Sequence, residues 1–191
     1  MICDKLDISV WELIRLANRH PRVNILQPGP GVGGHCIAVD PWFIVSKTPE
    51  QARLIRTARE VNDSKPEWVL KKVKLAVADF LQTNPSKTSR DVTIACFGLA
   101  FKPDIDDLRE SPAVEIACEI ANSHPGPILA VEPNIDTVPP SLVGKLQLHH
   151  TATALLAADI IVLLVDHQEF KELKHTIAKT KYTIDTRGIL N

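Results

Sequence analysis

Apolar residues recur every three or four positions at the start of the chain. Ile2, Leu6, Val10 and Leu13 follow this spacing, which is typical of one face of an amphipathic helix. The pattern predicts a helix over residues 1–18. No Ser, Thr, Asp or Asn precedes the stripe as a cap, which indicates a chain that begins inside a helix.

A second helical pattern covers residues 49–81. One face of it carries four apolar residues: Leu54, Ile55, Ala58 and Val61. Pro66 fits poorly inside a continuous helix, because proline lacks an amide donor and clashes with the preceding turn. We therefore expect a break near residues 63–65 and two helices. The polar stretch 83–90 reads as a linker.

From residue 92 onward, short apolar runs alternate with helical segments. The runs cover residues 92–97, 128–131, 160–165 and 182–184. Runs that are continuous rather than alternating favour parallel strands with helices on both faces. Ser111 followed by Pro112 predicts the start of a helix that runs to Ile120, and residues 151–157 form another.

These patterns together predict an α/β protein in two parts. Residues 1–88 form a central helical domain. Residues 89–191 form a Rossmann-like, doubly wound parallel sheet, whose carboxyl edge is the expected place for a ligand.

Composition narrows the functional classes. Hydrophobic residues make up 45% and charged residues 24%, with a formal net charge of -1, so the chain has the profile of a globular protein and lacks the basic footprint of nucleic-acid binding. The longest apolar run, residues 160–165, is too short to cross a bilayer, and the start is no signal peptide. We expect a cytoplasmic protein without a membrane partner.

Four cysteines are spread over the chain: Cys3, Cys36, Cys96 and Cys118. They form no Cys-x-x-Cys pair, which argues against a metal site and against a disulfide framework. Reduced thiols are therefore expected.

Residues 29–34 formally satisfy the dinucleotide pattern G-x-G-x-x-G. That motif needs a strand before it and a helix opening inside it, whereas residues 35–41 read as extended chain here. Four glycines just before Cys36 would instead hold its thiol close to a ligand. The alternative is a buried structural cysteine, and the proximity of His35 and Asp40 weakens it.

A second candidate site is the loop after residue 97. Lys102 and Arg109 lie ahead of a helix start, where an anionic phosphate is favoured; ion pairs with the aspartates of the same loop are the equal alternative. Arg187 follows the last strand and would reach the same edge. His20 and Arg22 follow the end of the first helix. The helix dipole favours positive side chains there, which is enough to explain their presence.

Three motifs of this chain resemble segments of one protein family. Residues 27–44, with Gly-Gly-His-Cys at 33–36, resemble the catalytic segment of the UDP-glucose/GDP-mannose dehydrogenase family. Residues 97–112 resemble its C-terminal UDP-binding domain, and residues 184–188 resemble its closing Asp-x-Arg-Gly element. The resemblance spans essentially the whole chain, and three motifs in the right order are far more specific than one.

The resemblance implies the oxidation of a sugar C6 alcohol to a carboxylate, with two NAD and one water. It points to members that act on UDP-N-acetyl-D-mannosamine. Cys36 would be the nucleophile, through a thiohemiacetal and a thioester, and Asp40 would organise the water and the thiol. Arg109 matches a position associated with NAD. Six residues match substrate-contacting positions: His20, Arg22, Gly33, Phe101, Lys102 and Arg187.

The expected partners are a UDP-sugar and a second copy of the chain, packed through residues 1–82. NAD would be bound mainly by an N-terminal domain that these residues do not include, so we expect the isolated chain not to oxidise substrate. The alternatives are a non-catalytic UDP-sugar-binding and dimerisation module, or a different nucleotide in the α/β half. GDP-linked and glucose-type substrates also stay open.

Overall fold

Four parallel strands form the sheet that the apolar runs predict. The computed structural model describes residues 1–138, 140–180 and 182–191. The strands are β1 (Ile94–Phe97), β2 (Ile128–Val131), β3 (Ile160–Leu163) and β4 (Tyr182–Asp185). Their order is β2-β1-β3-β4, and every neighbouring pair is parallel. The chain therefore reverses its winding direction between β1 and β3, where an α/β sheet opens a crevice at its carboxyl edge.

Helices cover both faces of this sheet, as a doubly wound fold requires. One face is covered by α5 (Lys65–Thr83) and α6 (Pro112–Ser123), and the other by α7 (Thr151–Ala157), α8 (Gln168–Glu172) and α9 (Lys174–Ile177). Successive β1 residues enter opposite cores: Ile94 packs with the α5 and α6 side chains, and Ala95 packs with the α7 to α9 side chains. The predicted α/β fold class is confirmed.

Local signals explain several helix boundaries. Ser111 caps α6, and Pro112 occupies its first position, as predicted. The predicted break before Pro66 is also present. Helix α4 (Arg53–Asp63) ends just before Ser64, and α5 begins just after it. Two short 3-10 turns, η1 (Ser89–Asp91) and η2 (Pro140–Leu142), lie in the connections.

The single helix predicted over residues 1–18 is wrong. The structure has α1 (Ile2–Lys5) and α2 (Val10–Ala17) instead. Asp7 takes a left-handed conformation with φ 54°, which interrupts the helix. Ser9 then caps α2, since its side-chain oxygen accepts a hydrogen bond from the Glu12 amide.

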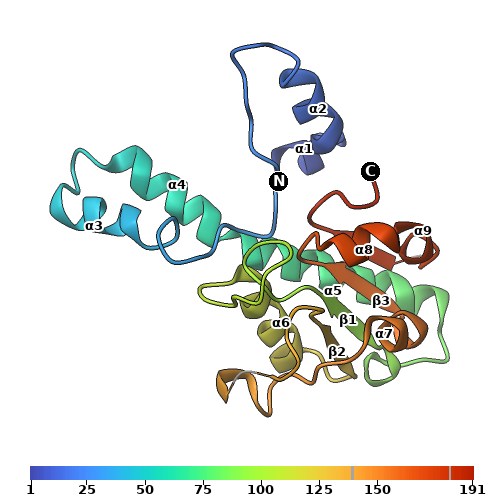
Figure 1. The fold of residues 1–191 in the computed structure, drawn as a ribbon. Coiled ribbons are helices and arrows are strands. Elements are labelled where there is room, and N and C mark those ends of the chain that lie inside the picture. The colour runs from blue at the N-terminus through green and yellow to red at the C-terminus, as the bar shows by residue number, and fades with distance from the viewer. Residues whose placement is uncertain (139, 181) are drawn as a thin grey trace.

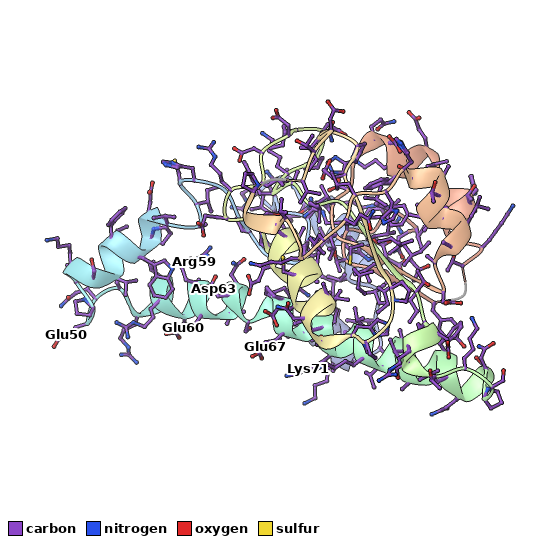
Figure 2. The ribbon with its side chains drawn as sticks, turned by 90° about the horizontal axis from the view of Figure 1, so that it is seen from below. Glu50, Arg59, Glu60, Asp63, Glu67 and Lys71 are labelled. Carbon is purple, nitrogen blue, oxygen red and sulfur yellow. The ribbon has the colours of Figure 1, made fainter. Side chains whose placement is uncertain are left out.

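The prediction that residues 35–41 form extended chain is also wrong. The segment with Cys36 forms turns that lead into α3 (Asp40–Lys47), and the amides of Val39 and Asp40 both donate to the Cys36 carbonyl. Figure 1 shows α1 and α2 above the sheet and α3 and α4 extending to one side of it. Figure 2 shows α4 continuing along the line of α5 beyond the sheet, with Arg59 on α4 and Lys71 on α5.

Within the described ranges, none of the helices has the length and apolar character needed to cross a membrane.

Candidate functional site

The glycine-rich loop of residues 29–34 lies against the carboxyl edge of the sheet. A methyl group added to Gly29 would meet the Arg187 guanidinium, which follows β4. One added to Gly33 would meet the Glu110 carbonyl oxygen and the Pro112 ring, at the start of α6. Only glycine permits so close an approach. The loop that precedes the candidate nucleophile, Cys36, is thereby brought to the candidate phosphate edge.

Phe101 completes this contact from the loop after β1. Its ring lies against Gly34, where an added Cβ would be 2.9 Å from Phe101 Cε2. Gly34 also has φ 89°, a left-handed conformation that glycine adopts without strain. Three residues predicted to contact the substrate therefore lie where the loop meets the sheet edge: Gly33, Phe101 and Arg187. Lys102, the next residue after Phe101, is exposed.

Asn62 on α4 fixes the middle of the glycine-rich loop from the other side. Its Oδ1 accepts a hydrogen bond from the Val32 amide at 2.8 Å. Asn62 was not among the residues predicted from the sequence. An amide side chain near the end of a helix gives no sequence signal for a partner 30 positions away.

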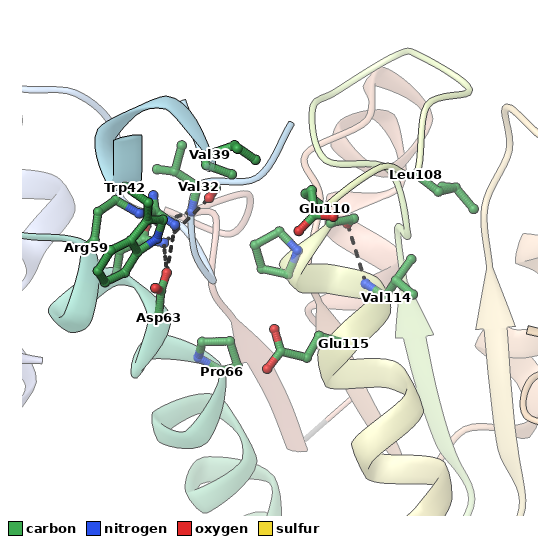
Figure 3. Close-up of a pocket in the computed structure, with 14 residues that line it drawn as sticks. Val32, Val39, Trp42, Arg59, Asp63, Pro66, Leu108, Glu110, Val114 and Glu115 are labelled. Carbon is green, nitrogen blue, oxygen red and sulfur yellow. Dashed lines mark hydrogen bonds and ion pairs between the residues drawn. The ribbon is translucent and has the colours of Figure 1, made fainter. Parts of the chain in front are cut away.

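A cavity of about 530 Å³ lies between this loop, α4 and α6. Figure 3 shows Trp42, Arg59 and Asp63 on one side of it and Glu110 and Glu115 on the other. Arg59 pairs with Asp63 at 2.7 Å, and its Nε atom is buried without a partner among the described residues. Burial raises the pKa of Glu115, and the charges of Asp63 and Glu119 raise it further.

Cys36 lies at the surface, two positions before Ala38, which lines the cavity. Its thiol is exposed, and its Sγ lies 3.6 Å from Nδ1 of the neighbouring His35. Asp40 follows at the start of α3, where its amide donates to the Cys36 carbonyl at 2.8 Å. An exposed thiol beside an imidazole can act as a nucleophile, because the imidazole can accept its proton.

Arg187 is more than a plain surface arginine. Its Nη2 and Nε lie 2.6 Å and 2.7 Å from Asp166 Oδ1, and both side chains are mostly buried. Burial by itself would raise the pKa of Asp166, but the charges and hydrogen bonds of Arg187 and Lys171 outweigh it and lower that pKa. Asp166 therefore fixes the guanidinium, and Nη1 is left facing Gly29.

Arg109 forms an ion pair within its own loop, which was the alternative to a phosphate site in the sequence analysis. Its Nη2 lies 2.6 Å from Asp107 Oδ2. The hydrogen bonds from Arg109 lower the pKa of Asp107 to about 2. The Arg109 side chain is exposed, whereas the Asp107 side chain is partly buried.

His20 and Arg22 lie apart from the sheet edge. Both are exposed in the loop after α2, and the Arg22 amide donates to His20 Nδ1 at 3.2 Å. Within this chain the structure does not bring them to Cys36; this loop belongs to the part that stands above the sheet in Figure 1.

Two buried polar residues at the same edge were also missed, Glu132 after β2 and His167 after β3. The sequence did hold a signal for both, because each follows an apolar strand at its carboxyl end, where ligand sites of α/β proteins gather.

The described residues do not by themselves fit a dinucleotide such as NAD. The glycine-rich loop has no strand before it and runs into turns. Glu132 stands after β2, where dinucleotide domains place the acid that binds ribose. Its carboxylate already accepts bonds from Leu99, Ala100 and His167.

The fold and these motifs correspond to one enzyme family. Residues 95–191 match the UDP-binding domain of the UDP-glucose/GDP-mannose dehydrogenase family, and residues 1–64 match its central domain. The chain belongs to the UDP-glucose/GDP-mannose dehydrogenase family.

Among its relatives, the UDP-N-acetyl-D-mannosamine dehydrogenase of Yersinia pestis is 64% identical over 189 residues, or 99% of this chain and 45% of that protein. The NDP-N-acetyl-D-galactosaminuronic acid dehydrogenase of Ralstonia solanacearum is 58% identical over 99% of this chain and 42% of its own length. A solved UDP-N-acetyl-mannosamine dehydrogenase from S. aureus matches 100% of this chain and 42% of its own, with 40% identity and a TM-score of 0.76. The chain spans less than half the length of these relatives.

Proposed function

We propose that residues 1–191 form the nucleophile-bearing and UDP-sugar-binding part of an NAD-dependent nucleotide-sugar 6-dehydrogenase. The substrate is UDP-N-acetyl-D-mannosamine and the product its uronate. The observation that carries the proposal is the contact between the glycine-rich loop before Cys36 and the sheet edge with Phe101 and Arg187. The substrate choice is supported by the 64% identity to the Yersinia pestis enzyme.

In this proposal Cys36 holds the sugar covalently. Its thiolate adds to the carbonyl carbon of the C6 aldehyde and forms a carbon–sulfur bond, and the carbonyl oxygen takes up a proton. A two-electron oxidation, in which the thiohemiacetal carbon loses a hydride and its oxygen loses a proton, would leave a thioester on the same sulfur. Water adds to the thioester carbon and releases the carboxylate and the thiol. Asp40 orients this water, and NAD is the oxidant that family membership supports.

The remaining residues bind the nucleotide and the sugar. Lys102 and Arg187 supply positive charge for the diphosphate at the sheet edge, where Arg187 is preorganised by Asp166. Phe101 and Gly33 shape the contact with the catalytic loop. Family correspondence supports substrate contacts for His20 and Arg22 and an NAD contact for Arg109. In the division we propose, 1–88 is the central domain and 89–191 the UDP-binding domain.

We also propose a homodimer through the central helices. On α4, Leu54 is 87% exposed and Val61 is 56% exposed, seven positions apart on one face. Phe43 on α3 is exposed as well. Such an uncovered apolar stripe is typical of a subunit interface. Across it, His20 and Arg22 of one copy would reach the site of the other.

Calorimetric titration of the protein with UDP tests the binding site. We expect UDP to bind, and Lys102→Ala and Arg187→Lys each to weaken it about tenfold, the loss of roughly one charge-assisted hydrogen bond. Lys145→Ala, an exposed lysine elsewhere, is the matched control and should leave the affinity unchanged. Equal affinity in all three variants would contradict the assignment.

The competing proposal is a UDP-sugar-binding and dimerisation module without turnover. It rests on the same contact between the glycine-rich loop and the sheet edge, and differs from the first proposal only in the chemistry at Cys36. Incubation with the C6 aldehyde of the UDP-sugar separates the two proposals. Mass spectrometry should find an adduct on Cys36 that is lost in Cys36→Ala, whereas a module binds the nucleotide and forms no adduct.

A further inference from the structure

Glu132 and His167 lie beneath the loop that carries Phe101 and Lys102. Their side chains are 0% and 1% exposed. Burying a carboxylate is costly unless hydrogen bonds replace its lost water. The partners of Glu132 therefore show which part of the fold this pair stabilises.

Glu132 holds the start of the loop. Its Oε2 accepts hydrogen bonds from the amides of Leu99 at 2.7 Å and Ala100 at 3.0 Å. Burial by itself would raise the pKa of Glu132, but the hydrogen bonds from His167 and from these two amides outweigh it and lower the pKa. The group is therefore an ionised acceptor at neutral pH.

His167 holds the end of the loop. Its Nδ1 accepts a hydrogen bond from the Asp104 amide at 2.9 Å. Because an accepting nitrogen carries no proton, the proton is on Nε2, which donates to Glu132 Oε2 at 3.0 Å. Asp104 Oδ1 is farther from Nδ1, at 3.6 Å, and accepts from the Gln168 amide instead.

Asn134 links the two side chains. Its Nδ2 lies 3.1 Å from both Glu132 Oε1 and His167 Nδ1. The loop is thus fixed at residues 99–100 and again at residue 104. Phe101 and Lys102 lie between these two anchors.

We propose that Glu132 and His167 are positioning residues for the nucleotide-sugar site. They fix residues 99–104 and so hold Phe101 against Gly34, with Lys102 at the sheet edge. The inference rests on the proposed UDP-sugar site. Neither residue needs to touch the ligand.

The test compares Glu132→Gln with Asp159→Asn. Glutamine keeps the size of Glu132 but presents an NH2 group to donors that need an acceptor. Asp159 is the matched control, because it accepts from the Thr93 amide at 2.9 Å at the opposite edge of the sheet. Both changes remove a charged acceptor of backbone amides, and only the first concerns the loop.

Two quantities are measured for each variant: amide hydrogen exchange in residues 98–107 and the affinity for UDP. In Glu132→Gln we expect exchange at Leu99, Ala100 and Asp104 to accelerate and the affinity to fall about tenfold, as for one lost bond to a charged group. In Asp159→Asn the exchange rates of the loop amides and the affinity for UDP should stay within about twofold of the unmodified protein, even where the melting temperature falls.

The outcomes separate the two proposals. Absence of UDP binding in the unmodified protein contradicts the proposed function, whereas unchanged loop exchange in Glu132→Gln overturns the anchoring. Faster exchange with unchanged UDP affinity overturns the positioning role. If Glu132→Gln does not fold, His167→Gln gives the same test at Asp104, since Gln can place its NH2 group where Nε2 donates to Glu132 but lacks the acceptor that holds the Asp104 amide. The same two results would overturn the proposal there.

Discussion

The reactivity of each thiol is decided at the residue scale by its surroundings. Cys36 is exposed beside His35. Cys96 on β1 is fully buried, and burial raises its pKa to about 12, because a thiolate there would lose its water. The same side chain is therefore inert in one place and available for chemistry in the other.

Alkylation with iodoacetamide at about pH 8, near the usual thiol pKa, should modify Cys36 first. Cys96 should stay unmodified until the protein unfolds, because only the thiolate reacts. Peptide mapping by mass spectrometry over time measures both rates. Adding UDP-sugar should slow the reaction of Cys36 if the proposed site is right. Early modification of Cys96 would contradict its burial.

The ion pair of Asp107 and Arg109 gives a prediction about pH. The hydrogen bonds from Arg109 lower the pKa of Asp107 to about 2. Since the folded pKa lies below the ordinary value, the stabilisation is present above that value and is lost as the pH falls toward 2. Arg109→Ala should raise this pKa toward the ordinary 3.8.

Carboxyl NMR titration measures the change directly. Asp91 is the internal control, because its pKa is lowered mainly by hydrogen bonds from Thr88, which Arg109 does not touch. An unchanged pKa of Asp107 in Arg109→Ala would show that this pair does not form in solution.

At the scale of elements, the glycine-rich loop joins two parts of the chain. It contacts the start of α6 through Gly33, the loop after β1 through Gly34, and α4 through the Val32–Asn62 hydrogen bond. These contacts come from segments far apart in the sequence. The loop therefore depends on close packing on both sides more than on any helix or strand of its own.

Gly33→Ala should separate the loop from α6. The added methyl group would collide with the Glu110 carbonyl and the Pro112 ring, and overpacking of this kind typically costs about 1–3 kcal/mol. Gly144→Ala is the control: its φ of 78° strains an alanine, but nothing lies within 4 Å. Thermal unfolding and UDP titration should show weaker nucleotide binding only in Gly33→Ala. Equal binding by both variants would contradict the contact.

At the scale of the whole molecule, the sheet and its covering helices contain the buried cores, whereas α4 contains no buried residue. Its apolar face was recognised in the sequence from Leu54, Ile55, Ala58 and Val61. In the structure this face is uncovered, because α4 extends beyond the sheet with α3 beside it. This arrangement is the reason for the proposed dimer.

Leu54→Arg should therefore shift the protein from dimer to monomer in sedimentation velocity, since a charge in a subunit core is costly. Leu156→Arg on α7 is the matched control, because Leu156 is 91% exposed, close to the 87% of Leu54, but lies on the sheet domain. Dissociation by Leu156→Arg, or a monomeric unmodified protein, would contradict an interface on α4.

The sequence alone determined the parts of the fold that depend on neighbouring residues. Apolar runs located all four strands, Ser111 and Pro112 located the start of α6, and Pro66 located the break between α4 and α5. Each signal acts within a few residues, through hydrophobic periodicity, capping or a missing amide donor. The motifs likewise led to the family, which the comparisons confirm.

Only the tertiary structure decided which distant residues meet. Glu132 and His167 are 35 positions apart, and Val32 and Asn62 are 30 apart; no local pattern links such pairs. The glycines gave the same sequence pattern as a dinucleotide loop, and only their contacts with Phe101, Pro112 and Arg187 show why glycine is needed there. Local propensity fixes an element, but a site forms where packing brings several elements together.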